Sequence, residues 1–261
     1  MTSTFDPEKV ARHVLAEHAR RADYRNLPAE LAPATIADAY AAQLALVRML
    51  VPRKGKVAGL KIATTTKVMQ QLMGIDHPCG GTIFERTVHQ SPAKLRLADY
   101  QHVVIECELA VRLGRDLPTA TTTYTGQSVA PAIGALMPAF ELIEDRNADY
   151  KQTSALSIIA DNCWNAGIVL GAPVACDPAR PLDGIAGKLT INDRDTHEGR
   201  TDGPLETLAW IANLAAGQDR PLTAGMVVIT GSVIPTLPIK AGDRFVFALD
   251  GLGSVSVTGD Q

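Results

Sequence analysis

The sequence has no excess of basic charge and no long apolar run, and each absence excludes a class of protein. Its 25 Lys and Arg residues are outnumbered by 28 Asp and Glu residues, for a formal charge of −3. A general nucleic-acid binder is excluded, since affinity for phosphate backbones comes mainly from clustered basic side chains. No stretch reaches the ~20 apolar residues of a membrane span, and residues 1–10 lack the apolar core of a signal peptide. We therefore expect a cytoplasmic protein that binds neither nucleic acid nor membrane.

Several motifs of known chemistry are missing too. None of the four cysteines lies in a C-x-x-C pair, so free thiols are expected rather than a zinc knuckle or a thioredoxin-like site. The six histidines form no H-x-x-x-H pair, and the chain has no G-x-S-x-G, no P-loop and no G-x-G-x-x-G. Any catalytic chemistry must come from other residues.

The distribution of apolar residues predicts an α+β protein. Two helices are expected near the N-terminus, one from Asp6-Pro7 to about Arg21 and one from Thr35 that ends at Pro52. Strands and turns dominate from about residue 57 without a repeated βαβ pattern, so a doubly wound sheet is not expected. We divide the chain into an N-terminal helical region, 1–55, and a β-rich catalytic core, 56–261, that forms one functional domain.

Three apolar segments of this core contain turn-forming residues. Residues 77–81, with the sequence HPCGG, are predicted to be irregular. Pro131, Gly134 and Pro138 are predicted to interrupt the apolar run 131–143. A strand over 226–230 leads into Thr230-Gly231-Ser232, which fits a turn and could also bring backbone close to a ligand through Gly231.

Alternation over Val103–Val111 makes this segment the clearest strand in the chain. Side chains alternate across a strand, so Glu106 and Glu108 share one face while Cys107 points toward a core. Two carboxylates about 7 Å apart along a strand can converge on one Mg²⁺, Mn²⁺ or Ca²⁺ ion. An acidic, half-solvated strand face is the alternative interpretation.

A third acid and a lysine strengthen the interpretation as a cation site. Glu141 lies within the apolar run, where an ionised carboxylate is costly unless a cation or hydrogen bonds compensate. The neighbouring residues 144–146 are predicted to form a solvated, mutually paired turn. Lys61 lies between Leu60 and Ile62 and would face away from both. It could bind a substrate carboxylate, transfer protons if burial lowers its pKa, or remain on the surface.

Several separate strings, in the right order from about Thr35 to the C-terminus, resemble the fumarylacetoacetate hydrolase superfamily. The resemblance is to the branch of 2-keto-4-pentenoate hydratases and 4-oxalocrotonate decarboxylases. The strings are GLKIATTTKVMQQLMGID (59–76), IECELAVRLGRDL (105–117), PAFELIEDRNADY (138–150), IADNCWNAG (159–167), LAWIAN (208–213), MVVITGS (226–232) and KAGDRF (240–245).

The resemblance implies a fold and a set of site residues. The fold is a mixed β-roll of the fumarylacetoacetate hydrolase C-terminal-domain type, here with an N-terminal helical region, and many members are homo-oligomers. The resemblance places a Mg²⁺ or Mn²⁺ ion on Glu106, Glu108 and Glu141. It places Lys61 at the substrate, and the substrate-binding loop falls on Thr230, Gly231 and Ser232.

The chain departs from this branch at one position. Hydratases commonly carry an acid/base aspartate where this chain has Cys79, beside His77 and Pro78. Related decarboxylases also lack the aspartate, which favours decarboxylation. Ser232 favours a hydratase, since decarboxylases tend to have a glycine there.

The leading hypothesis is therefore a metal-dependent lyase that adds water to an enolisable 2-oxo-enoate, formed from a 2-hydroxydienoate. A 4-oxalocrotonate-type decarboxylase is the first alternative. The second is an acylpyruvate hydrolase, with His77 or His89 and Glu85 supplying a base for water. The third, kept open by Cys79, is a catalytically silent subunit that pairs with a pathway enzyme.

Overall fold

The first two helices begin with the expected capping residues. The computed structural model describes residues 5–119 and 122–261. In α1 (Pro7–Ala19) the Asp6 carboxylate accepts hydrogen bonds from the first turn, and α2 (Ile36–Lys54) begins with a reciprocal capping box between Thr35 and Asp38. The predicted end of the second helix at Pro52 is wrong. A proline in the last turn removes only one backbone bond, so α2 continues to Lys54 and stops at Gly55.

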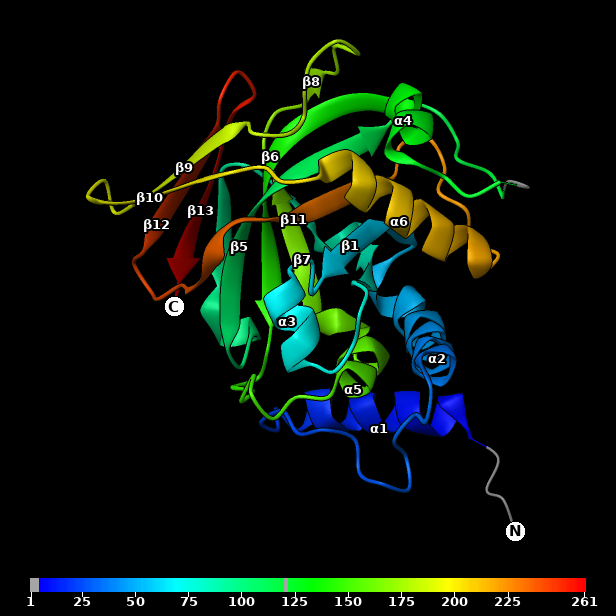
Figure 1. Cartoon of the computed structure of the whole chain (residues 1–261). Helices are drawn as coiled ribbons and strands as arrows, with labels where there is room; N and C mark the ends of the chain where they lie inside the picture. The colour runs from blue at the N-terminus through cyan, green and yellow to red at the C-terminus, as the bar shows by residue number, and fades with distance from the viewer. Residues whose placement is uncertain (1–4, 120–121) are drawn as a thin grey trace.

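The rest of the chain is a mixed α/β fold built on two sheets (Figure 1). The first has the strand order β2-β1-β11-β5-β6-β7-β3, with β8 paired to β6, and the second has the order β10-β9-β12-β13-β4. The first sheet comprises β1 (Val57–Ala63), β2 (Cys79–Phe84), β3 (Val88–Gln90), β5 (Val103–Leu113), β6 (Ile133–Glu144), β7 (Asn165–Leu170), β8 (Val174–Ala175) and β11 (Val227–Pro238). The second comprises β4 (Ala93–Arg96), β9 (Ala186–Ile191), β10 (Asp195–Arg200), β12 (Arg244–Leu249) and β13 (Gly253–Asp260).

Within the described residues, four further α-helices cover the sheets: α3 (Lys67–Leu72), α4 (Gly126–Val129), α5 (Ala155–Ala160) and α6 (Pro204–Gly217). In Figure 1 the N-terminal helix α1 lies below the sheets, and α3 lies in front of them. Gln43 of α2 donates hydrogen bonds to the carbonyls of Gly80 and Ile159, which joins this helix to β2 and α5. Whether residues 1–55 behave as a region apart from 56–261 stays a prediction. Among the described residues, no helix combines the length and the apolar character needed to cross a bilayer.

Three predicted interruptions are strands instead. Residues 77–81 were predicted to be irregular, but strand β2 begins at Cys79. Gly81 lets this strand approach its neighbours closely, since a Cβ there would lie 2.8 Å from the Asn162 carbonyl oxygen. Strand β6 continues through Pro138 and through Gly134, where its register against β5 shifts. Strand β11 continues through Thr230–Ser232, where a shift of register against β5 accommodates Gly231 at φ 110°.

The core lies behind the acidic face of β5. Ile105, Cys107 and Leu109 belong to the largest buried apolar cluster, which also includes residues of the second sheet and of α6. The rings of Phe140 in β6 and Phe247 in β12 lie 6.2 Å apart and connect the two sheets. Burial of one face of β5 fixes the direction in which the alternate residues point. The predicted core position of Cys107 is confirmed.

Candidate active site

Three carboxylates meet on two neighbouring strands. Glu106 and Glu108 project from one face of β5, and Glu141 projects from β6, whose register places it directly opposite Glu106. Each carboxylate offers one oxygen, and these oxygens all lie within 4.8 Å of one another. The strand period accounts for the first two residues, and the antiparallel pairing adds the third.

The hydrogen bonds to these acids leave two buried oxygens free. The backbone N–H of Gly231 donates to Glu108 Oε2 at 2.7 Å, and Asn165 Nδ2 donates to Glu141 Oε1 at 3.0 Å. Among the described residues, Glu108 Oε1 and Glu141 Oε2 are buried without a hydrogen-bond partner. A buried acceptor with no partner is costly, so these two oxygens are suited to receive a cation.

Lys61 stands beside the acids rather than on the surface. It lies in β1, is 2% exposed, and its Nζ is 2.9 Å from Glu141 Oε1. Burial alone would lower the pKa of Lys61, but the negative charges around it, chiefly Glu141, outweigh this effect and raise the pKa. Lys61 is therefore a charged hydrogen-bond donor here, and the lowered pKa considered for proton transfer is not found.

One lysine does not compensate three carboxylates. Burial and the charges of Glu141 and Glu106 raise the pKa of Glu108 well above its usual value. Burial also raises the pKa of Glu141, to about 7, even though Lys61 opposes the shift. Burial therefore makes negative charge costly at this site, and one lysine offsets that cost only in part. A divalent cation would supply the missing positive charge, and carboxylate oxygens are the ligands that Mg²⁺ and Mn²⁺ prefer.

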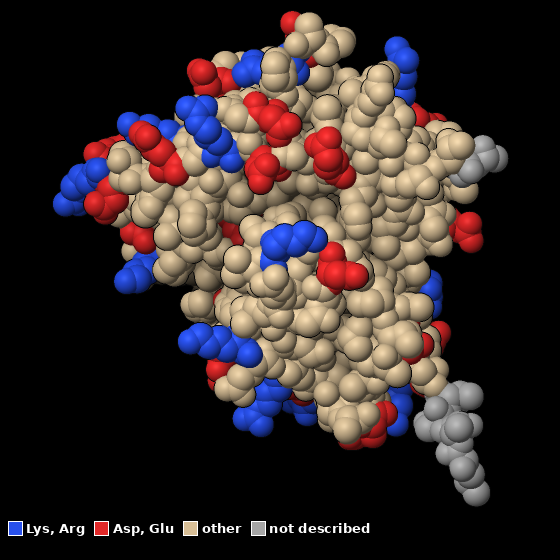
Figure 2. Space-filling view, viewed as in Figure 1, with Lys and Arg blue, Asp and Glu red and all other residues tan. Residues whose placement is uncertain are grey.

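A cavity of about 480 Å³ opens at this cluster. Lys61 and Glu106 line it, while the fully buried Glu108 and Glu141 lie behind them. Its other walls come from Thr64–Thr66, from 231–236 in β11, and from apolar residues of α3, β6, α5 and the turn after α5. Figure 2 shows a face that is hollowed near its centre, with acidic and basic side chains interspersed over it. The cavity is large enough for a small organic acid.

A strained turn shapes one wall of this cavity. Asn162, Cys163 and Trp164 follow α5 with φ angles of 51°, 49° and 58°, a conformation that residues with side chains rarely adopt. The buried Asn162 amide holds the turn by bonding both the N–H and the carbonyl of Thr82 in β2. Consequently Cys163 and Trp164 face the cavity.

Buried ion pairs support this turn, and they correct one prediction. Residues 144–146 were expected to form a solvated turn paired within itself, but Asp145 and Arg146 are 3% and 4% exposed. Arg146 pairs with Asp161 at 2.6 Å, just before the strained turn, and Asp145 binds His102 at 2.6 Å. These distant partners could not be seen from the local sequence, which showed only adjacent opposite charges.

The other predicted site residues are divided between the cavity surface and the buried interior. Cys79 is 1% exposed in β2 and is not among the cavity's described lining residues, and burial raises the pKa of its thiol. Gly231 and Ser232 line the cavity, whereas the Thr230 hydroxyl donates to the Leu109 carbonyl inside the sheet.

The residues of the hydrolase alternative are not brought together at the cavity. His77 stacks on Trp210, with ring centroids 6.2 Å apart, and its Nδ1 lies 2.7 Å from the Pro78 carbonyl oxygen. Glu85 pairs with Lys56 at 3.8 Å, and His89 lies in β3. His77, His89 and Glu85 are all absent from the described residues that line the cavity.

Sequence reasoning missed three polar residues of the site: Thr236, whose hydroxyl donates to Glu106, and also Asn165 and Tyr150. Asn165 binds Glu141, and Tyr150 lines the cavity while its hydroxyl donates to Asp145 at 3.0 Å. Both lie in strings that resemble the superfamily, and Asn165 is a buried amide beside an apolar strand. The position of Asn165 beside an apolar strand could have identified it as a site residue, because a buried amide requires a hydrogen-bond partner.

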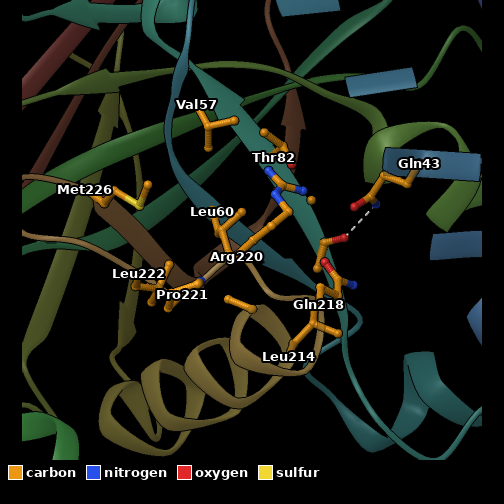
Figure 3. A pocket seen from close by; sticks show the side chains of 13 residues that line it. Gln43, Val57, Leu60, Thr82, Leu214, Gln218, Arg220, Pro221, Leu222 and Met226 are labelled. Carbon is orange, nitrogen blue, oxygen red and sulfur yellow. Dashed lines mark hydrogen bonds between the residues drawn. The ribbon is translucent and has the colours of Figure 1, made fainter. Parts of the chain in front are cut away.

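A smaller cavity of about 140 Å³ lies behind β1, where Leu60 faces it (Figure 3). Because side chains alternate along a strand, the neighbouring Lys61 lies on the other face of β1. Leu214 of α6 and Leu222 supply apolar walls, and the Arg220 side chain reaches toward Thr82. No carboxylate is among its described lining residues. The acidic chemistry therefore belongs to the larger cavity.

The protein is similar to known enzymes. A 2-keto-4-pentenoate hydratase of Burkholderia vietnamiensis (strain G4 / LMG 22486) is 31% identical over 78% of each chain. A 2-oxo-hept-4-ene-1,7-dioate hydratase of Escherichia coli is 28% identical over 95% of each. The crystal structure of 4-oxalocrotonate decarboxylase from Pseudomonas putida G7, complexed with magnesium and adipate, superposes with a TM-score of 0.88 at 24% identity over 97% of each chain. This likeness confirms the predicted fold.

The family model for the fumarylacetoacetate (FAA) hydrolase C-terminal domain matches residues 75–258. The match spans β2 to β13, and so includes the three carboxylates, the strained turn and the glycine at 231. The chain belongs to the fumarylacetoacetate hydrolase family.

Proposed function

We propose that this protein is a hydratase of the 2-keto-4-pentenoate type, which adds water to an enolisable 2-oxo-enoate formed from a 2-hydroxydienoate. Glu106, Glu108 and Glu141 would hold the divalent cation, Mg²⁺ or Mn²⁺. The observation that carries the proposal is the meeting of these three carboxylates, with two unpartnered buried oxygens, at the end of a cavity lined by Lys61. The names of the similar curated proteins support the reaction type.

The side chains around the acids position the substrate. When bound, the cation would act as a Lewis acid toward the 2-oxo group and the enolate derived from it. Lys61 is fixed by Glu141 and carries a positive charge, so its Nζ can bind and orient the substrate carboxylate. Gly231 fixes Glu108 through its backbone N–H, which leaves the second oxygen of that carboxylate pointing away from β11.

The reaction needs an electron sink at the 2-oxo group. The dienol is first converted to the 2-oxo-3-enoate, and water then adds at C4, which is conjugated to the carbonyl. Hydroxyl groups from Thr64, Thr65 and Ser232 lie along the same cavity and can hold a water molecule beside the substrate. Apolar walls exclude bulk water, which strengthens the electrostatic contribution of Lys61.

Decarboxylation of a 4-oxalocrotonate-type acid is the second candidate, and Cys79 favours it. The thiol stands where the hydratases that this chain resembles commonly carry an acid/base aspartate, and it is buried. Loss of CO₂ from a vinylogous position uses the same carbonyl as its electron sink, so the carboxylate cluster fits both reactions. Ser232, which lines the cavity, favours the hydratase.

One assay separates these reactions and tests the site. Ultraviolet absorbance follows a panel of 2-hydroxydienoates with Mg²⁺, with Mn²⁺ and with EDTA, while CO₂ is measured in parallel. We expect metal-dependent loss of dienoate absorbance without CO₂; stoichiometric CO₂ would favour the decarboxylase. Glu106→Gln should abolish turnover, whereas Glu198→Gln, the same change on an exposed strand, should leave it intact. Full activity of the purified protein in EDTA would contradict the proposal.

The proposal also covers the oligomeric state of the protein and its location in the cell. We propose that the protein is a homo-oligomer in the cytoplasm, on the basis of its resemblance to the superfamily. From the same resemblance we also propose that this protein associates with an enzyme of the same pathway. Light scattering of the purified protein measures the first, and co-purification with a candidate partner measures the second.

A further inference from the structure

One part of the larger cavity is lined by apolar side chains. Its lining residues there are Met69, Met73, Ile143, Ile158 and Trp164. Ile143, Ile158 and Trp164 belong to one buried apolar cluster, and Met73 and Tyr150 pack against it. These side chains come from β6, from α5 and the turn after it, and from the segment of α3. They therefore form a continuous wall rather than scattered contacts.

Sheet register places this wall next to the reaction end. Ile143 lies two residues beyond Glu141 on β6, so both project from the same face, about 7 Å apart along the strand. A 2-oxo acid held at Lys61 and Glu106 therefore extends its far end, beyond C4, toward Ile143 and Trp164. A cavity of about 480 Å³ has room for such a tail.

The wall offers no positive charge to a second carboxylate. Lys61 is the sole cation among the described residues that line the cavity, and it is already paired with Glu141. The Tyr150 hydroxyl donates to Asp145, and the Cys163 thiol donates to the Gly80 carbonyl oxygen at 3.3 Å. The neutral indole Nε1 of Trp164 is buried without a partner, so a carboxylate here would lose its hydration and gain at most one uncharged hydrogen bond from that N–H group.

We infer that the apolar wall is a tail subsite that selects monocarboxylate substrates: 2-hydroxydienoates that carry an alkyl or aryl tail. Substrates with a carboxylate at the far end are rejected. The inference rests on the proposed function for the chemistry at the other end of the molecule. Family membership does not decide the point, because the similar proteins carry names with one carboxylate and with two.

The test compares probes that differ only at the tail. Three 2-hydroxydienoates are assayed with Mg²⁺: one without a tail, one with a short alkyl tail and one with a terminal carboxylate of equal length. Because an unpaired buried carboxylate costs several kcal/mol, we expect kcat/KM for the alkyl probe to exceed that for the carboxylate probe by about 100-fold or more. Equal values, or a preference for the carboxylate probe, would overturn the inference.

A binding measurement keeps this result distinct from failure of the proposed function. Calorimetry compares saturated, unreactive 2-oxoheptanoate with 2-oxoheptanedioate in the presence of Mg²⁺. Tighter binding of the monocarboxylate supports the tail subsite even if no dienoate is consumed, an outcome that would refute the hydratase alone. Tighter binding of the dicarboxylate refutes the subsite whatever the turnover.

Two matched variants locate the selectivity. Met73→Arg adds a cation at a half-buried lining position, and Leu72→Arg adds the same charge to the adjacent residue, which is 46% exposed and is not among the lining residues. We expect Met73→Arg to raise kcat/KM for the carboxylate probe about tenfold or more, since a buried charge pair is stronger than an exposed one. Leu72→Arg should leave the ratio between probes unchanged. Equal effects of the two variants would place the selectivity outside this wall.

Discussion

Replacement of Glu108 by glutamine should make the metal-free protein more stable and the metal-loaded protein less stable than the wild type. Glu108 is fully buried, and burial and the neighbouring acids raise its pKa well above the usual value. A folded-state pKa above the unfolded one means that the ionised carboxylate costs stability at neutral pH, and that this cost disappears as the pH falls. An amide carries no charge and can donate to Glu141 or Glu106, whose oxygens lie within 4.8 Å.

The magnitude follows from the unpartnered oxygen. Relief of one buried, unsatisfied acceptor is worth about 1–3 kcal/mol. In a chain of this size each kcal/mol shifts Tm by about 2–4 °C. The wild type should gain about 4.1 kcal/mol from Mn²⁺ at about 1,000 times its Kd, and Glu108→Gln should gain almost nothing. The order of stability of the two proteins should therefore reverse when metal is added.

Thermal unfolding followed by circular dichroism, in EDTA and in Mn²⁺ at pH 7.5, measures both effects. Glu198→Gln is the control, because it makes the same substitution on an exposed strand and should track the wild type in both buffers. If Glu108→Gln is less stable than the wild type in EDTA, the reasoning about excess negative charge is wrong. If it is stabilised by Mn²⁺ as much as the wild type, Glu108 is not a ligand.

Three further substitutions probe the support of the site. Gly81→Ala places a Cβ 3.0 Å from the Lys61 Cγ and 2.8 Å from the Asn162 carbonyl oxygen. Because this Cβ would displace the lysine, kcat should fall about tenfold or more. Unchanged kinetics would show that the neighbouring atoms can move to make room. Asn162→Ala leaves the N–H and carbonyl of Thr82 unpaired. It should lower the free energy of unfolding, measured by urea denaturation, by about 2–4 kcal/mol. A loss below about 1 kcal/mol would mean that water replaces the amide. Cys79→Ser should change kcat/KM less than about threefold, since the thiol is buried in the apolar cluster behind the cavity wall and is not among the described lining residues. A large loss would assign the thiol a role in proton transfer.

Local periodicity was sufficient to predict part of the carboxylate cluster. The shared face of Glu106 and Glu108 follows from the two-residue period of one strand, and the burial of Cys107 follows from the same pattern. From the residues alone Glu141 was recognised as an unusual acid in an apolar run, and it was the resemblance to the superfamily that grouped it with the other two acids. Its approach to the other two depends on the register between β5 and β6, which no spacing within either strand specifies.

Predictions based on single turn-forming residues failed where tertiary contacts decided the outcome. Pro138 sits in the middle of β6, paired with Leu109, and Gly231 is accommodated inside β11 by a shift of register. The sequence around 144–146 indicated a surface turn because its charges are adjacent. In the folded chain Arg146 instead reaches Asp161, fifteen positions away, and both are buried. Such pairs are visible only when the elements are packed together.

Apart from Ile143 of β6, the apolar wall of the cavity rests on other parts of the fold than the acids, and this separates chemistry from substrate choice. The carboxylates and Lys61 project from the central strands of one sheet, where a change of register would move every neighbour. Trp164 and Met73, in contrast, come from the turn after α5 and from the end of α3, outside the strand pairing. Substitutions at the apolar end can therefore alter the tail that is accepted while the acids stay in place. This division predicts that Met73→Arg changes the ratio of kcat/KM between probes far more than it changes the affinity for Mn²⁺.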